Sequence, residues 1–240
     1  IGSVSDDSWT ESHFDALEMT AKTLNLEMIY RENIVDDSTC INIMEELIAE
    51  GCGIIICNSY GYGPYITKVA QEYPEIKFLH AAGTETGENL GTYFGRIYQM
   101  RYLSGIVAGM QTKTNEIGYV AAFNIPEVNR GINAFTLGVQ AANPNATVHV
   151  AFSDSWTDYN QNAKTTEDLL KNHDIDVITL HADSNATLDI AEEKGIWSIG
   201  YNLDNTEKYP NTFLTASVWS WEKYYKPYLI KCIQGKNISM

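Results

Sequence analysis

The sequence predicts an α/β protein built from two Rossmann-like lobes with parallel sheets. Short apolar runs alternate with amphipathic helical patterns along the 240 residues, which is typical of βαβ units. The run Gly53–Cys57 is apolar throughout, as expected for a strand covered by helices on both faces. The alternation restarts near residue 116, and the length allows two lobes of roughly 110–120 residues each.

The first half of the chain predicts four helices and three strands. Apolar residues at helical spacing begin at Phe14, and Ser12 is a candidate cap for this first helix. Gly51 is placed to end the second helix. The predicted helices are 14–24, 40–48, 64–73 and 96–111, and the predicted strands are 26–30, 53–57 and 77–81.

The second half predicts five strands and four helices in the same rhythm. Pro126 suits the first turn of its helix. The predicted strands are 116–121, 147–152, 176–180, 196–200 and 213–217, and the predicted helices are 126–142, 160–173, 185–194 and 219–234. We assign residues 1–114 plus 218–240 to an N-terminal lobe and 115–217 to a C-terminal lobe, joined by a hinge.

One short motif occurs twice, each time just ahead of a helical pattern. It reads Asp6-Asp7-Ser8-Trp9-Thr10 near the start and Asp154-Ser155-Trp156-Thr157 after the strand 147–152. Ligands of open α/β sheets bind at the carboxyl ends of strands. Two indoles facing across a cleft suit a flat aromatic ligand, so we expect Trp9 and Trp156 to enclose one, although each indole could also be a core residue.

Polar loops follow several other predicted strands and supply further candidate ligand-binding residues. Their carboxylates and amides could accept hydrogen bonds from a ring N–H or a sugar hydroxyl. Helix capping is an equally good explanation for Asp183. The candidates in these loops are Ser59, Tyr60, His181, Asp183, Asn202 and Asp204.

Charge and motifs exclude several classes of function. A net charge of −15 repels phosphate backbones and argues against nucleic-acid binding. No apolar run reaches the ~18 residues of a membrane span. No G-x-S-x-G, Walker or H-E-x-x-H motif is present. The pair His181-x-Asp183 is more typical of hydrogen bonding than of metal ligation, so we expect neither an enzyme, nor a cofactor, nor a metal site.

The four cysteines form no C-x-x-C pair. Cys40, Cys57 and Cys232 fall on predicted apolar faces, where free thiols are common. We therefore expect buried free thiols rather than a metal site.

A family resemblance rests on the segments Asp6–Thr10 with His13, Tyr93–Arg96 with Tyr102–Gly105, Ile117–Phe123, Ile125–Val128, Arg130–Phe135, Ser155–Trp156 and Gly200–Asp204. Together they resemble the basic membrane protein family of ABC-transporter substrate-binding proteins, in particular its purine- or adenine-binding branch. The resemblance implies a type I periplasmic binding protein fold with ligand in the interlobe cleft. It also implies a bacterial extracytoplasmic location, either periplasmic or lipid-anchored, and an ABC permease as partner. It adds Asp6 and His13 to the candidate ligand-binding residues and indicates a chain trimmed at both ends.

Two departures from the family pattern bear on the ligand. Asn202 stands where the family's G-x-D-x-D has the Asp that is linked to ribose hydroxyls. Trp219 stands where the nucleoside receptors have Lys. Both changes favour a free purine base over a nucleoside, and Trp219 could form a third aromatic wall.

Three functions compete at this stage. The first is a monomeric receptor that captures a purine base or nucleoside for an ABC importer and closes about its hinge. The alternative is the extracellular ligand-sensing domain of a membrane signalling receptor, such as a kinase or cyclase. The third is a nucleoside hydrolase that uses the Asp183 and Asp204 carboxylates.

Overall fold

The computed structural model describes residues 1–236, which form two compact units. Unit 1 contains residues 1–5, 10–95 and the described residues from 220 onward. Unit 2 contains Asp6–Trp9 and Arg96–Trp219. Each unit has its own parallel sheet.

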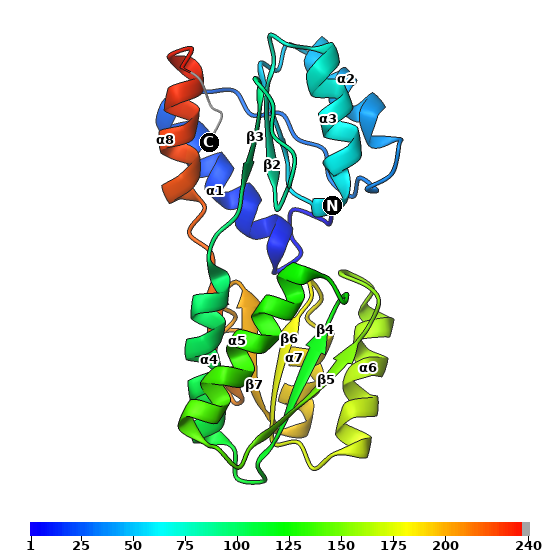
Figure 1. The fold of residues 1–240 in the computed structure, drawn as a ribbon, viewed down its shortest axis with the longest axis vertical. Coiled ribbons are helices and arrows are strands. Elements are labelled where there is room, and N and C mark those ends of the chain that lie inside the picture. Colours follow the sequence, from blue (N-terminus) through cyan, green and yellow to red (C-terminus); the bar gives the residue numbers. More distant parts are fainter. Residues whose placement is uncertain (237–240) are drawn as a thin grey trace. The chain divides into compact units, whose positions relative to one another are not determined.

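The sheet of unit 1 has three parallel strands in the order β1-β2-β3 (Figure 1). Helices α2 and α3 pack on one face, where Ile66, Val69 and Phe78 are fully buried. Helices α1 and α8 lie on the other side of the strands (Figure 1). The bounds are α1 Trp9–Leu24, α2 Cys40–Ala49, β1 Ile54–Cys57, the short 3-10 helix η1 Tyr60–Tyr62, α3 Gly63–Glu72, β2 Lys77–Ala81, β3 Leu90–Tyr93 and α8 Glu222–Ile233.

The predicted strand at 26–30 is wrong. Helix α1 is followed by Asn25 in the left-handed conformation (φ 54°), and the next residues form no strand. They line the same apolar cavity, of about 440 Å³, as β1 does. Within residues 1–236 β1 pairs with β2 alone, so the segment has strand-like side chains but no hydrogen-bonding partner for its backbone.

The sheet of unit 2 has five parallel strands in the order β5-β4-β6-β7-β8. Helices α4 and α5 cover one face, and α6 and α7 cover the other (Figure 1). The bounds are α4 Ile97–Gln111, β4 Glu116–Ala121, α5 Pro126–Ala142, β5 Thr147–Phe152, α6 Tyr159–Asn172, β6 Val177–His181, α7 Ala186–Lys194, β7 Trp197–Asn202 and β8 Phe213–Val218.

This architecture confirms the predicted α/β class with parallel sheets in two groups. The sequence patterns located the five strands of unit 2 to within about two residues. They missed β3, whose four residues include Gly91, because a short strand with an internal glycine gives little periodic signal.

Helix α4, which we assigned to the N-terminal lobe, groups with unit 2. Two glycines explain its close contact with α5. A Cβ on Gly105 would lie 2.0 Å from the carbonyl oxygen of Phe135, and one on Gly138 would lie 2.0 Å from that of Tyr102. The two helix backbones therefore approach each other at positions where no side chain larger than hydrogen fits.

The cysteines follow the prediction in part. Cys40 and Cys57 are buried free thiols, whereas Cys232 is only half-buried. In the described part of the chain no helix is long and apolar enough to cross a membrane.

Gly138→Ala should destabilise unit 2 by on the order of 2–4 kcal/mol, because the added methyl group must push α4 away from α5. Urea unfolding followed by circular dichroism measures this change. Gly53→Ala is the matched control, since a Cβ there meets nothing within 4 Å. Equal stability of the two variants would contradict the close helix contact.

Candidate ligand-binding site

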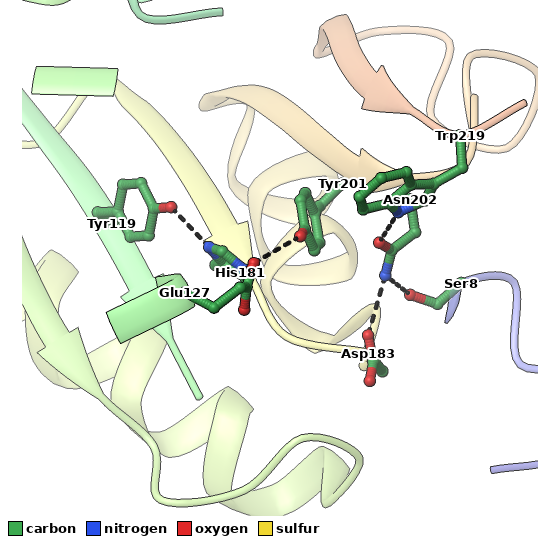
Figure 2. Close-up of polar contacts among 8 residues, drawn as sticks. All are labelled: Ser8, Tyr119, Glu127, His181, Asp183, Tyr201, Asn202 and Trp219. Carbon is green, nitrogen blue, oxygen red and sulfur yellow. Dashed lines mark hydrogen bonds and ion pairs between the residues drawn. The ribbon is translucent and has the colours of Figure 1, made fainter. Parts of the chain in front are cut away.

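The carboxyl ends of the unit 2 strands gather aromatic and polar side chains. Strand β6 ends at His181 and leads to Asp183, while β7 ends at Asn202. Trp219 directly follows β8, and Trp156 lies in the loop after β5. Because all five strands are parallel, these residues lie at the carboxyl ends of the strands, which form the carboxyl edge of the sheet. Figure 2 shows His181, Asp183, Asn202 and Trp219 of this group.

The side chain of Asn202 connects three segments of this edge. Its Nδ2 group donates to Ser8 Oγ and to Asp183 Oδ1, both at 2.9 Å. Its Oδ1 accepts from Trp219 Nε1 at 2.8 Å (Figure 2). The residue is fully buried and adopts a left-handed backbone (φ 74°), which asparagine tolerates better than most residues. Both amide hydrogens are used inside the protein.

Asp183 is partly buried, and its carboxyl group lies among protein groups. Burial, followed by the nearby charge of Asp6, raises its pKa well above the ordinary value, and the hydrogen bond from Asn202 opposes this only in part. The backbone N–H of Asp183 donates to the carbonyl of Trp156 at 2.8 Å, which holds the tryptophan loop against the end of β6. A partly buried carboxyl of this kind favours a ligand that supplies N–H or O–H donors.

A second carboxylate at this edge, Glu127, already has partners. It lies in the first turn of α5 and contacts His181 Nε2 at 3.1 Å, while the Tyr201 hydroxyl donates to the same oxygen at 3.5 Å. Burial would raise the pKa of Glu127, but the charge and hydrogen bond of His181, together with Arg130, hold it below its ordinary value. This carboxylate is therefore ionised and satisfied.

Contacts at both ring nitrogens fix the orientation of the His181 imidazole. Since a carboxylate can only accept, Nε2 carries the proton that faces Glu127. The other ring nitrogen, Nδ1, contacts the Tyr119 hydroxyl at 3.0 Å (Figure 2). The imidazole is fully buried and serves to fix the tyrosine and glutamate around it.

Arg101 of α4 lies beneath this group with no exposed surface. Its guanidinium is 4.9 Å from the ring centroid of Tyr119 and 5.4 Å from that of Tyr201. It donates to Thr179 Oγ1 at 3.2 Å. The cation–π contacts stabilise the buried guanidinium charge where few hydrogen-bond acceptors are available.

The two tryptophan loops share one backbone feature. Asp7 (φ 50°) and Asp154 (φ 54°) each adopt the left-handed conformation two residues before the tryptophan. Aspartate accepts this conformation more readily than bulky residues do. The loops then differ, because Trp9 begins α1 whereas Trp156 lies three residues ahead of α6.

Each tryptophan meets a second aromatic ring in unit 2. Trp9 makes an edge contact with Trp219 (centroids 5.7 Å apart, 77° between planes). Trp156 makes one with Phe123 (5.6 Å, 60°). Trp9 is 8% exposed, and Trp156 is more open.

Of the remaining candidates in unit 2, Asp6 accepts from the Ser8 backbone N–H at 2.9 Å. Asp204 is exposed and accepts from the backbone and side chain of Thr206, which lowers its pKa. The geometry of Asp204 is that of a turn-forming aspartate. A ligand role for Asp204 stays a prediction.

Three candidates belong to unit 1. His13 is buried, stacks on Trp221 with centroids 4.4 Å apart, and contacts the Tyr225 hydroxyl. Burial lowers its pKa well below the ordinary value, so its imidazole is neutral. The Ser59 carbonyl contacts His80 Nε2 at 2.6 Å, and Tyr60 is 55% exposed.

Sequence reasoning missed the supporting residues Ser8, Tyr119, Glu127 and Tyr201. One signal was available for Glu127, which is an acidic residue directly after a helix-starting proline and a strand. For the two tyrosines the alternation of strand residues indicated burial but not a hydrogen-bonding role.

The whole chain, residues 1–240, matches the family model of the PnrA-like ABC transporter substrate-binding proteins. The chain belongs to this family. It is a family of substrate-binding receptors rather than enzymes, which removes the nucleoside hydrolase from consideration.

Two curated relatives are similar over nearly the whole chain. A purine-binding protein of Brucella abortus (strain 2308) is 34% identical over 227 residues, which cover 94% of this chain and 65% of the relative. A protein of Haloferax volcanii, named for glucose binding in an ABC transporter, is 36% identical over 236 residues, covering 98% of this chain and 60% of the relative. The chain thus spans 60–65% of the length of these relatives.

The fold is also similar to solved structures. A solute-binding protein of an ABC transporter system from Aeropyrum pernix K1 superposes with a TM-score of 0.85, covering 100% of this chain and 71% of that one. The identity is 19%, so this similarity concerns the fold alone. It supports the predicted type I periplasmic binding protein class.

Asp183→Asn should stabilise this member of the family at neutral pH. Because the folded-state pKa is raised, the folded protein binds the Asp183 proton more tightly than the unfolded chain does. Stability is therefore highest below the unfolded pKa of about 3.9 and falls as pH rises through the folded pKa. Asn keeps the contact to Asn202 without this loss, and we expect the Tm at pH 7 to rise by roughly 2–4 °C.

Asp204→Asn is the control of opposite sign. Its pKa is lowered by Thr206, so its contribution is present above the unfolded pKa and is lost on acidification. Melting curves from about pH 2 to pH 8 compare the two variants, because the loss for Asp204 falls below its unfolded pKa of about 3.9. A lower Tm for Asp183→Asn than for the parent at pH 7 would contradict the raised pKa.

Proposed function

We propose that this chain captures a free purine base at the carboxyl edge of the unit 2 sheet and serves as the solute-binding part of an ABC importer. The observation that carries the proposal is the partly buried carboxyl group of Asp183, bonded to Asn202, at an edge that also holds Trp156, Trp9 and Trp219. A flat heterocycle with N–H donors matches both features. Stacking of a base on an aromatic ring contributes roughly 1–3 kcal/mol.

The carboxylates explain why the ligand should be rich in donors. Glu127 is already bonded to His181 and Tyr201, whereas Asp183 has one hydrogen bond from Asn202 and faces the charge of Asp6. Ring and exocyclic N–H groups of a purine would stabilise the ionised Asp183. An aromatic ring without donors would leave the carboxyl unsatisfied, at a cost of about 1–3 kcal/mol.

The internal bonding of Asn202 favours a base over a nucleoside. Its two amide hydrogens go to Ser8 and Asp183, and its oxygen accepts from Trp219. A residue engaged in this way positions the loops and has little capacity left for ribose hydroxyls. The similarity to a purine-binding protein supports the class of ligand.

A sugar is the second candidate, because the Haloferax volcanii relative is named for glucose binding. Aromatic rings also stack on sugars, but a hexose needs several hydrogen-bonding partners for its hydroxyls. At this edge Glu127, His181 and Asn202 are already engaged with one another or with neighbouring residues. This difference favours the purine.

The family supports an extracytoplasmic location and an ABC permease as the partner. A ligand role for His13, Ser59 and Tyr60, which belong to unit 1, stays a proposal.

Isothermal titration calorimetry of unfolded and refolded protein tests the ligand. We expect adenine, guanine or hypoxanthine to bind with micromolar affinity or better, and adenosine, guanosine and glucose to bind at least tenfold more weakly. Refolding removes any ligand carried through purification. Tight nucleoside binding would overturn the free-base assignment, and glucose binding without purine binding would overturn the purine class.

Trp156→Ala should weaken purine binding by roughly 5- to 100-fold, which corresponds to the loss of one stacking contact. Trp197→Ala is the matched control, because Trp197 starts β7 at the opposite edge of the same sheet and is 38% exposed. Titration calorimetry with the best-bound base measures both variants. The same loss in the two variants would argue against a stacking role for Trp156.

A further inference from the structure

Three potential metal ligands lie close together near the amino ends of the unit 2 strands, which form the amino edge of the sheet. Glu116 is the first residue of β4, His149 is the third of β5, and His173 directly follows α6. One ligand atom from each residue lies within 4.8 Å of the other two. The candidate ligand-binding residues lie at the carboxyl ends of the same strands, so this cluster is separate from them.

The strand register places two of the ligands on one face of the sheet. His149 pairs with Gly118, and Thr147 pairs with Glu116. Glu116 and Gly118 are two residues apart and share a face, so His149 lies on that face as well. Gly118 contributes no side chain between them.

The third ligand comes from the helix layer above. Helix α6 ends at Asn172, and His173 has extended backbone (φ −137°, ψ 149°) with its N–H bonded to the carbonyl of Leu169. Its imidazole stacks on that of His149 with centroids 3.6 Å apart and 20° between the planes. Within residues 1–236 the side chain of His173 makes this ring contact and no hydrogen bond, whereas His149 Nε2 contacts Glu116 Oε2.

We propose that Glu116, His149 and His173 bind a divalent transition-metal ion of the Zn²⁺ type. Two imidazoles and one carboxylate are a common zinc ligand set, and imidazole favours zinc, copper or nickel over calcium or magnesium. All three side chains are partly exposed, so an ion has access and water can complete the coordination. The net charge of −15 raises the local concentration of cations.

Binding needs only side-chain rotation. Zinc–nitrogen bonds of ~2.0–2.1 Å place tetrahedral ligands about 3.3 Å apart, which is closer than the 4.8 Å limit of the cluster. The stacked rings must fan apart so that one nitrogen of each points at the ion. The ion would then connect β4, the edge strand β5 and the end of α6, and it would stabilise unit 2 by mass action.

The test is calorimetric titration of tag-free, chelator-treated protein with Zn²⁺. We expect one ion per chain with micromolar or tighter affinity. His149→Ala, His173→Ala and Glu116→Gln should each weaken binding at least tenfold. Glu167→Gln is the matched control, because Glu167 is an exposed carboxylate on α6 outside the cluster, and it should bind like the parent.

A second measurement needs no variant. The chain has five histidines, and the imidazole NMR resonances of His149 and His173 should respond to one equivalent of Zn²⁺ while the other three do not. No binding by the parent protein would overturn the site. Binding that survives all three substitutions, or that perturbs other imidazoles instead, would also overturn it.

Discussion

The candidate ligand site depends on one amide. Asn202 ends β7 in a left-handed conformation, and its side chain is bonded to Ser8, Asp183 and Trp219. These partners come from the first tryptophan loop, the loop after β6 and the residue after β8. In its left-handed conformation Asn202 directs its side-chain amide across the ends of the neighbouring strands. One side chain therefore fixes the positions of the three segments that contain Ser8, Asp183 and Trp219.

Two carboxylates at this edge have opposite environments. Glu127 is stabilised as an ion by His181, whereas Asp183 is partly buried beside the charge of Asp6 with one amide donor. Ionising a carboxyl in these surroundings costs stability in the unliganded protein, and a ligand that donates hydrogen bonds offsets this cost. The Asp183 carboxyl therefore selects ligands that donate hydrogen bonds. The stability that it costs the unliganded protein is recovered when such a ligand binds.

The candidate ligand site and the proposed metal site lie at opposite ends of the unit 2 strands. Its carboxyl edge has aromatic rings and carboxyl groups fixed by Asn202, His181 and Arg101. Its amino edge has two histidines and a glutamate with ligand atoms near each other. Parallel strands make this possible because every strand presents its end to the same edge. Close contact between α4 and α5, at Gly105 and Gly138, keeps Arg101 beneath the tyrosines.

The sequence by itself determined the alternation of strands and helices, since apolar periodicity reports burial directly. It also indicated the two tryptophan loops, whose shared left-handed aspartates the structure reveals.

Tertiary structure decided the rest. The apolar segment 26–30 is not a strand, because strand formation requires a partner that local sequence does not specify. The roles of Glu127, Tyr119 and Arg101, and the meeting of Glu116 with His149 and His173, depend on contacts between residues far apart in the chain. Such contacts are set by strand order and register, which periodicity within one segment cannot report.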